Sequence, residues 1–235
     1  MSLPSQSLTE QQQFAMVAER LDQGVNSLAL ELSDRQKESL IAYLFELRKW
    51  NRTYNLTALK TIEEMLVQHV FDCLAVIPAL EQYENKQNLE FKVIADIGSG
   101  AGLPAVVLAI ARPNSRVISI DAVQKKTSFV QNAANRLGLV NLEARHSRVE
   151  QVNDVKAELV ISRAFASLSE FVRLAHPLVS PGGVMAAMKA KRLEAEIEDF
   201  SAGPYPWQVH QVDELKVPEM QAERSIAWLR RKNDE

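Results

Sequence analysis

The sequence has few of the residues that cross-link secreted proteins or bind metal ions. Its 235 residues include one cysteine, Cys73, and four histidines. A single cysteine cannot form an internal disulfide, and the histidines are scattered without metal-ligand spacing. We therefore expect a cytoplasmic protein with no bound metal, in which Cys73 is a small core residue.

Long apolar runs are also absent. No stretch approaches the roughly 18 apolar residues of a membrane-spanning helix, and no charged and then apolar signal segment opens the chain. We expect no membrane contact, and a flexible polar tail over residues 1–7. The net charge of −3 excludes a general binder of polyanions, so any affinity for nucleic acid has to come from local patches.

Glycine is sparse, with eight in the chain, yet three of them are Gly98, Gly100 and Gly102. They follow an apolar run, and a helical pattern opens at Leu103, which is the strand, turn and helix order of a doubly wound α/β domain. Such a turn reverses sharply and lets a ligand touch its backbone. The next predicted strand ends in Asp121, 19 residues after Gly102, where an acid binds the two hydroxyls of a ribose.

The spacing of the glycines distinguishes between nucleotide-type ligands. Dinucleotide sites favour Gly-x-Gly-x-x-Gly, but here Leu103 occupies the position of the third glycine. Asp96, just before the first glycine, would repel a pyrophosphate and attract the cationic groups of S-adenosylmethionine. The sequence therefore favours a methyl donor. The candidate cofactor-binding residues of this region are Asp96, Gly98, Gly100, Gly102, Leu103 and Asp121.

The chain divides into a helical N-terminal extension, residues 1–90, and a Rossmann-like α/β domain, residues 91–235. In the second part strand and helix patterns alternate, which predicts a sheet with helices on both faces. The predicted strands are an apolar run that starts at Val93 and ends in Asp96, and residues 116–120, 140–144, 158–162 and 184–188, with a closing hairpin of residues 207–212 and 225–229.

Three helices are predicted in the extension. Each opens with a Ser/Thr-x-x-Glu/Gln capping box, at residues 7–10, 33–36 and 61–64. We expect the first helix to turn Phe14 toward the core. Pro78 is predicted to stop the third helix, which leaves the polar residues after it as a linker, 81–90.

Two segments at the predicted carboxyl ends of the strands supply further candidates. In a methyl-donor site the turn before the fourth strand holds adenine, so we assign Val149 and Glu150 to it, although Glu150 is alternatively a solvated charge. Arg163, after the fourth strand, needs an anion nearby, which the cofactor carboxylate, an RNA phosphate or Glu150 would supply. The motif of amine-methylating enzymes and the Pro-Cys nucleophile are both missing there.

A basic patch lies in the second predicted helix. Residues 34–60 carry six basic residues against three acids, and Arg48, Lys49 and Arg52 alternate with aromatic and amide residues, as RNA-binding surfaces do. Taken alone, the patch is better explained as a solvated helix face with Trp50 in the core. Further candidates for RNA contact follow the fifth strand: Lys189, Lys191 and Arg192.

Taken together, the motifs resemble the bacterial small-subunit rRNA guanine-N7 methyltransferases, the RsmG (formerly GidB) family. The resemblance rests on four stretches: Trp50–Thr57, Asp96–Pro104, Ser147–Glu150 and Ile161–Ser167. It implies a helical extension on a Rossmann-like fold and methylation of a guanine N7 in the 530 loop of 16S rRNA within the 30S subunit. It also implies cofactor contacts at Gly98, Leu103, Val149, Glu150 and Arg163.

The chain departs from the family pattern at a few positions. Ala105 replaces a common Gly, Ala122 a Ser, Gln68 an Arg and Cys73 a Ser. Ala105 should be tolerated inside a helix start, whereas Gln68 and Ala122 leave the fine geometry of the site open.

Guanine N7 already has a lone pair, so the reaction needs alignment rather than a general base. We accordingly interpret His69 and Asp72 as packing or site-wall residues. Three rival functions remain: a small-molecule methyltransferase, a dinucleotide oxidoreductase, and a non-catalytic RNA-binding module. The extra basic helix disfavours the first, the glycine spacing the second, and the complete set of cofactor candidates the third. No feature calls for an obligate protein partner.

Overall fold

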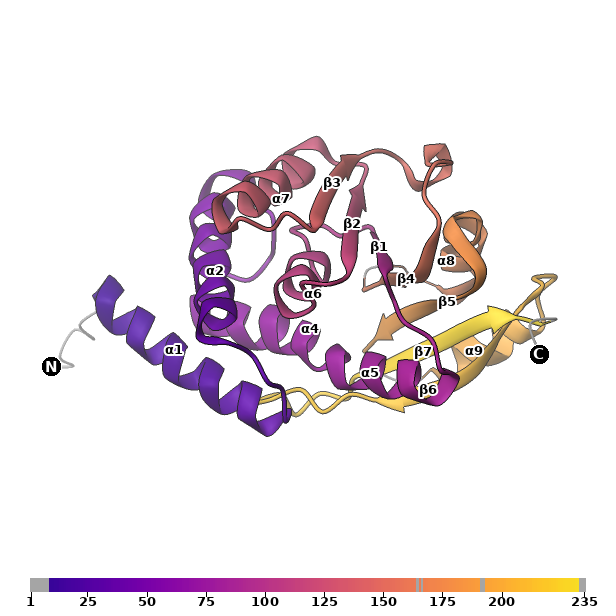
Figure 1. Cartoon of the computed structure of the whole chain (residues 1–235), viewed down its shortest axis with the longest axis horizontal. Helices are drawn as coiled ribbons and strands as arrows, with labels where there is room; N and C mark the ends of the chain where they lie inside the picture. The colour runs from indigo at the N-terminus through magenta and orange to yellow at the C-terminus, as the bar shows by residue number, and fades with distance from the viewer. Residues whose placement is uncertain (1–8, 164, 166, 191–192, 233–235) are drawn as a thin grey trace, which may run out of the picture.

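A computed structural model describes residues 9–163, 165, 167–190 and 193–232. Helices precede the sheet and then alternate with its strands (Figure 1). Those of the N-terminal part are α1 (Glu10–Ser27), α2 (Asp34–Tyr54), α3 (Ile62–Met65), the π-helix η1 (Leu66–Phe71), α4 (Asp72–Leu74) and α5 (Val76–Gln87). Those of the sheet region are α6 (Ala105–Ala111), α7 (Gln124–Leu137), η2 (Val149–Gln151), α8 (Leu168–Ala175), η3 (His176–Leu178) and α9 (Glu194–Ser201).

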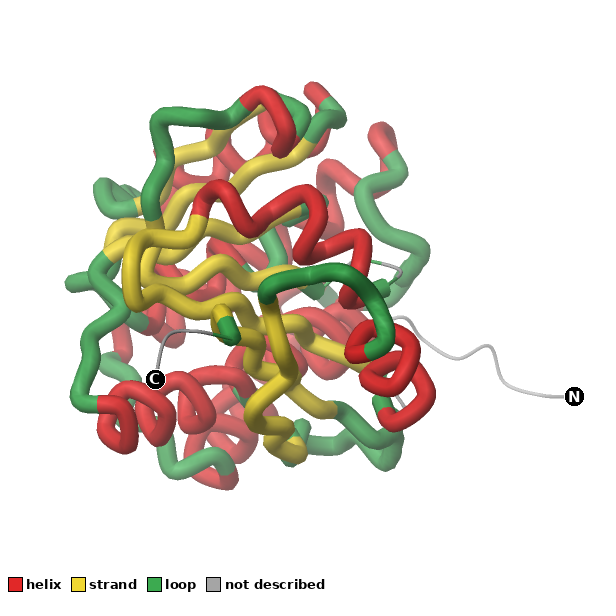
Figure 2. Tube along the Cα trace, turned by 90° about the vertical axis from the view of Figure 1, so that its right-hand side faces the viewer, coloured by secondary structure: helices red, strands yellow, loops and turns green. Residues whose placement is uncertain are grey.

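The sheet has seven strands in the order β3-β2-β1-β4-β5-β7-β6. The first five are parallel, and β7 pairs antiparallel with β5 and β6, which confirms the predicted closing hairpin. Helices lie on both sides of the sheet, as expected of a doubly wound fold (Figure 2). The strands are β1 (Val93–Ile97), β2 (Arg116–Asp121), β3 (Leu142–His146), β4 (Ala157–Ser162), β5 (Val179–Lys189), β6 (Trp207–Glu214) and β7 (Ser225–Arg231).

Two strands begin two or more residues away from their predicted starts. β3 begins at Leu142 instead of residue 140, because Val140 is fully exposed in the turn before it. β5 begins at Val179, five residues before the predicted start. The segment Pro181-Gly182-Gly183, whose composition predicts a turn, lies within β5, where the pairing of β4 with β5 shifts register.

Capping boxes explain where the N-terminal helices begin. Those predicted at residues 33–36 and 61–64 are confirmed, with both reciprocal hydrogen bonds in place. The first box is formed by Thr9 and Gln12 rather than by residues 7–10, and Ser7 lies outside the described residues. Phe14 of that helix is 46% exposed, so its predicted inward orientation is wrong.

The end of the third predicted helix is also corrected. Pro78 does not stop it, since it occupies the first turn of α5, where a helix makes no use of the backbone N–H that proline lacks. α5 then continues to Gln87, so most of the predicted linker is helical. Between α3 and α4 the chain forms the π-helix η1. This geometry is rare in proteins, and where it occurs it is often part of a functional site.

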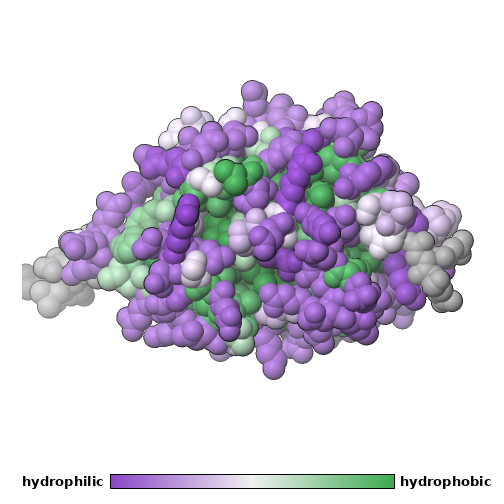
Figure 3. Space-filling view, in the orientation of Figure 1, coloured by the Kyte–Doolittle hydropathy of each residue, from purple (hydrophilic) through white to green (hydrophobic). Residues whose placement is uncertain are grey.

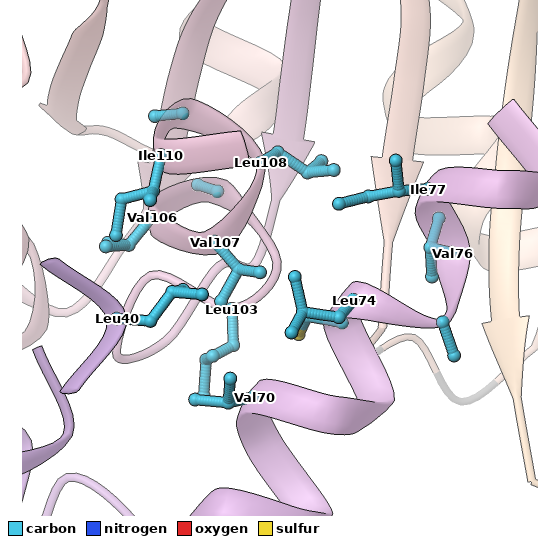
Figure 4. Close-up of a cluster of buried hydrophobic side chains, with 14 of the residues drawn as sticks. Leu40, Val70, Leu74, Val76, Ile77, Leu103, Val106, Val107, Leu108 and Ile110 are labelled. Carbon is cyan, nitrogen blue, oxygen red and sulfur yellow. The ribbon is translucent and has the colours of Figure 1, made fainter. Parts of the chain in front are cut away.

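The N-terminal helices and one face of the sheet share a single apolar core. α6 lies in its centre, and Leu103 and Val107 face Leu74 and Val70, with Leu40 of α2 beside them (Figure 4). Cys73 is fully buried in the same cluster, as predicted. α8 and α9 cover the other face with a separate apolar cluster. Figure 3 shows hydrophilic side chains over much of one face of the molecule.

The last connection of the sheet reaches back to the first helix. The segment between β6 and β7 runs beside the end of α1 in Figure 1, where Arg20 forms an ion pair with Glu219. Among the described helices none is both long and apolar enough to cross a membrane.

Candidate active site

The glycine turn after β1 is held against β2 by its own backbone. The amides of Gly98 and Ser99 donate to the carbonyl of Ile120 at 2.8 and 3.3 Å. The amide of Gly100 donates to Oδ2 of Asp121 at 2.9 Å, while Oδ1 accepts from Val123 N at 2.8 Å. Asp121 therefore ties the turn to the end of β2 through Oδ2, while Oδ1 holds the segment that leads into α7.

Two of the glycines have different physical roles. Gly100 has a φ of +59° and no heavy atom within 4 Å of where a Cβ would stand, so its backbone faces open space. Gly102 has a φ of +83°, and a Cβ there would meet Val106 at 2.5 Å and Val130 at 3.0 Å. Gly100 therefore leaves room for a ligand, whereas Gly102 lets α6 and α7 pack closely.

A cavity of about 220 Å³ opens at this end of β1 and β2. Four predicted cofactor residues line it together: Gly98, Asp121, Val149 and Glu150. Val149 is buried and Glu150 is exposed, so the first forms the wall of this cavity and the second its rim. We call the cavity the nucleoside pocket, after the ligand that the sequence predicts for it. The remaining lining residues are Ile97, Ile120, Ala122, Ser147, Arg148 and Phe165.

Other predicted cofactor residues do not line the nucleoside pocket. The side chain of Leu103 is 4% exposed and lies in the core beside Val70, which leaves only its backbone for a ligand (Figure 4). Gly102 supports helix packing, as described above. Arg163 lines a different cavity, which shares no lining residue with the nucleoside pocket.

Asp96 lies beneath the glycine turn with no exposure to solvent. Its Oδ2 accepts a hydrogen bond from Ala105 N at 2.9 Å, at the start of α6. Its Oδ1 is buried without a hydrogen-bond partner among the described residues. Burial raises the pKa of Asp96 to about 7, against the opposing effects of Ala105 N and Arg163. A cation that entered nearby would favour the ionised form of this carboxyl.

Arg163 and Arg224 converge on one carboxylate, that of Asp72. Nη1 of Arg163 lies 3.2 Å from Oδ2, and Nε of Arg224 lies 3.0 Å from Oδ1. Arg163 also donates to the carbonyl of Gln68 at 2.9 Å and lies 3.4 Å from Nδ1 of His69. The anion beside Arg163 is thus Asp72, which differs from the three sources expected from the sequence.

His69 joins this cluster as an uncharged group. Its Nε2 lies 2.8 Å from Oγ1 of Thr57, in the loop after α2. Burial, followed by the charge of Arg163, lowers the pKa of His69 to about 4, so the imidazole is neutral near pH 7. His69 and Asp72 are therefore site-wall residues, as interpreted, and η1 is the element that presents His69 and the Gln68 carbonyl to Arg163.

These residues line a second cavity, of about 390 Å³, which we call the outer pocket. Its walls come from the loop after α2, the η1–α4 region, the end of β4, the end of β5 and the start of β7. The lining residues are Thr57, Ala58, Leu59, Gln68, His69, Asp72, Arg163, Met188, Lys189, Ala190, Leu215, Arg224 and Ser225.

The N-terminal helices also touch the glycine turn directly. The hydroxyl of Tyr43, on α2, donates to the carbonyl of Ala101 at 2.7 Å, and the tyrosine side chain is fully buried. This contact joins segments 58 residues apart, and it holds the turn at Ala101, next to the residue that Asp121 holds.

The basic RNA-binding candidates do not form one surface. Arg48 lies over the ring of Phe45 and bonds to Gln13 of α1, with a side chain that is 16% exposed. Lys49 and Arg52 are exposed on the last turns of α2. Lys189 pairs with Glu196 at 2.7 Å and bonds to the carbonyl of Phe165. Lys191 and Arg192 lie outside the described residues.

Comparison with known proteins identifies the family. The model of the family GidB, rRNA small subunit methyltransferase G, matches residues 36–227. The ribosomal RNA small subunit methyltransferase G of Bordetella avium is 46% identical over 215 residues, which cover 91% of this chain and 93% of that one. This chain belongs to the rRNA small subunit methyltransferase G family.

Another member of the rRNA small subunit methyltransferase G family also matches over most of its length. That of Leptothrix cholodnii is 42% identical over 207 residues, covering 88% of this chain and 92% of the relative. Among solved structures, the ribosomal protein L11 methylase of Lactobacillus delbrueckii subsp. bulgaricus has a similar fold, with a TM-score of 0.50 and 13% identity over 68% of this chain and 76% of that one. The fold class and the methyltransferase family predicted from the sequence are therefore confirmed.

Sequence reasoning missed three residues of this rRNA methyltransferase. Arg224 lies in the connection before β7, 152 positions from the aspartate that it meets, and carries no motif. Phe165 lines the nucleoside pocket from a stretch that carried the family resemblance but in which only Arg163 was assigned a role. Tyr43 is one of several inward residues of α2, and nothing in its spacing distinguishes it from a core aromatic.

Proposed function

We propose that this chain transfers a methyl group from S-adenosylmethionine to N7 of a guanine in the 530 loop of 16S rRNA, on the small ribosomal subunit in the cytoplasm. Membership of the rRNA methyltransferase family supports the reaction class. The observation that carries the proposal is a pair of cavities, the nucleoside pocket, which Phe165 lines, and the outer pocket, which Arg163 lines.

The residues of the nucleoside pocket support S-adenosylmethionine as its ligand. The open space over Gly100 admits a ligand to the turn, and Asp121 lies in the pocket with oxygens that can accept ribose hydroxyls beside their backbone bonds. Val149 and Glu150 occupy the place for adenine. When bound, the cofactor supplies a methyl group on a positively charged sulfur, and Asp96 is the buried carboxyl whose charge favours that cation.

The acceptor side supports an alignment mechanism. N7 of guanine carries its own lone pair, so the protein has to place it in line with the methyl group and tolerate charge passing to the purine. The pKa of His69, lowered to about 4, makes its imidazole a weak base, and the Asp72 carboxylate is held by two arginines, so neither group is suited to act as a general base. Arg163, at the border between the pockets, is the candidate site residue for orienting the cofactor or the acceptor.

Contact with the rRNA is assigned to the end of α2. Lys49 and Arg52 are exposed there, and the loop that follows reaches the outer pocket at Thr57. A segment that carries cations on one side and lines the pocket on the other can bind phosphates while a nucleotide enters. Arg48 contributes mainly by packing α1 on α2.

The test is methylation of small subunits that lack the modification. We expect the protein to transfer label from methyl-labelled S-adenosylmethionine to 30S subunits, and mass mapping of the digested 16S rRNA to place it on one guanine of the 530 loop as N7-methylguanine. A matched Gly100→Asp variant, which fills the cofactor space, should transfer none. Label on an exocyclic amine, on a ribose or in another loop would refute the target, and its absence from RNA would refute the function.

A further inference from the structure

The outer pocket has a positive charge that the methyl donor does not need. Arg163 and Arg224 oppose the single carboxylate of Asp72, and His69 is neutral. Lys189, also in the lining, is compensated by Glu196. Two guanidinium groups against one carboxylate leave one positive charge in a cavity whose other walls include the apolar side chains of Leu59, Met188 and Leu215.

The two arginines differ in their distance from the cofactor turn. Arg163 directly follows β4, which pairs with β1. Ser162, the last residue of β4, donates a hydrogen bond to the carbonyl of Ile97 at the end of β1. Arg224 directly precedes β7, the third strand from β1, and strands lie about 4.8 Å apart, so its backbone is displaced by about 14 Å. In the order of the strands, Arg224 therefore starts farther from the glycine turn than Arg163 does, and the two side chains meet at Asp72.

Arg224 is held in place and still has donors to offer. Its Nε is fixed by Asp72, whose side chain is 5% exposed, and Nη1 donates to the carbonyl of Glu223 at 3.2 Å. Within the described part of the chain, Nη2 has no hydrogen-bond partner, and the side chain is 21% exposed. A guanidinium anchored at one nitrogen and open at another is suited to bind a phosphate oxygen.

We propose that the outer pocket receives the target nucleotide, that Arg224 binds its phosphate, and that Asp72 positions Arg224 for this contact. This inference rests on the proposed function, since it assigns the acceptor side of the same reaction. The volume of about 390 Å³ lies within the usual range of ligand pockets, roughly 300 to 1,000 Å³. The apolar walls suit a purine ring, and the cationic end suits the group attached to its sugar.

The decisive variant is Arg224→Gln, compared with Lys216→Gln. Lys216 is exposed in the same β6–β7 connection and does not line the pocket, so the control removes the same charge from the same segment. We expect Arg224→Gln to raise KM for 30S subunits about tenfold or more, the scale of a charge-assisted hydrogen bond, and to reduce the salt slope of binding by about one. Its kcat at saturation and its affinity for S-adenosylmethionine should stay within twofold of the unmodified protein, and Lys216→Gln should leave KM within twofold.

Other outcomes separate this inference from the proposed function. If the unmodified protein methylates 30S subunits and Arg224→Gln has the same KM and salt slope, the phosphate assignment is overturned while the function stands. If the unmodified protein transfers no methyl group to 30S subunits, the function fails, and the inference fails with it.

A second measurement tests the phosphate contact without a variant, in case Arg224→Gln does not fold. In the presence of S-adenosylhomocysteine, GMP and guanosine are compared as competitors of 30S binding to the unmodified protein. Competition by GMP at concentrations where guanosine has no effect supports a phosphate contact. Equal competition by the two, or by neither, overturns it. The positioning role of Asp72 is tested with a folded Asp72→Asn variant and with the double variant that also carries Arg224→Gln. A raised KM for 30S subunits in Asp72→Asn that is no higher in the double variant supports positioning. Effects of the two changes that add independently overturn it.

Discussion

The replacement of Asp96 by asparagine should make the protein more stable at alkaline pH. Asp96 is completely buried, one oxygen accepts from Ala105 N, and the other has no partner among the described residues. Burial raises the pKa of its carboxyl to about 7 in the folded protein, against about 4 for an aspartate in an unfolded chain. Asp96→Asn keeps an acceptor for Ala105 N and removes the charge.

The direction follows from proton binding. Between pH 4 and pH 7 the folded protein holds a proton on Asp96 that the unfolded chain has released, so its stability falls as pH rises through this window and levels off above it. The full cost of ionising the buried group is on the order of 4 kcal/mol, from about three pH units at 1.36 kcal/mol each. About 1.5 kcal/mol of this is already present at pH 5, so the change from pH 5 to pH 8 is about 2–3 kcal/mol.

The assay is urea unfolding of both proteins at pH 5 and pH 8. Burying an amide has a cost of its own, but that cost does not depend on pH and cancels when the two pH values are compared. We expect the free energy of unfolding of Asp96→Asn, relative to the unmodified protein, to be about 2–3 kcal/mol higher at pH 8 than at pH 5. Asp199→Asn, a change of an exposed carboxylate on α9, serves as the control and should show a much smaller difference.

One result would refute the reasoning. If the relative stability of Asp96→Asn is the same at the two pH values, Asp96 is not a costly buried carboxyl, and its unpartnered oxygen needs another explanation. In the expected case the more stable variant should bind S-adenosylmethionine more weakly in a calorimetric titration, because the carboxylate that attracts the cation is gone. The buried charge is then retained for binding at the expense of stability.

Three further predictions concern the cofactor and the RNA. Gly100→Asp should abolish S-adenosylmethionine binding while circular dichroism shows an intact fold, because a Cβ at this position points into open space; unchanged affinity would contradict the assignment of the turn. Asp121→Ala and Tyr43→Phe should each weaken cofactor binding, by about 1–3 kcal/mol and about 1 kcal/mol, because each removes a hydrogen bond that holds the glycine turn; calorimetry against the unmodified protein tests both. Charge reversal of Lys49 and Arg52 to Glu should lower 30S affinity and flatten its salt dependence without changing cofactor affinity; a salt series identical to that of the unmodified protein would show that these side chains are only solvated.

The parts of the site that were predictable are local in sequence. The glycine turn, Asp121 and the Val149–Glu150 segment follow strands that a short pattern identifies, and strand ends meet at one edge of a parallel sheet. Their convergence in the nucleoside pocket therefore needs only the order of the elements.

The outer pocket was not predictable for the opposite reason. Arg224 meets Asp72 across 152 positions, and the contact depends on where the β6–β7 connection folds back. The π-helix η1 has no signature in a sequence that reads as continuous helix, because its extra residue per turn is selected by contacts such as that of Arg163 with the Gln68 carbonyl. Pro78 misled for a similar reason, since only the position of α5 shows that the proline lies in a first turn.

The core shared by the N-terminal helices and α6 has a consequence for how genetic variation acts on this protein. Because Val106, Val107 and Leu108 are fully buried, and pack in the cluster that also contains Leu40 and Leu74, residues 9–90 are not a detachable adaptor that could be exchanged between enzymes. A fragment that starts at residue 91 would expose this apolar face and be prone to aggregation. Inherited changes on the buried side of α2 or α5 should therefore reduce the amount of enzyme in the cell, whereas changes at Lys49 or Arg52 should leave the amount normal and reduce only its encounter with the ribosome.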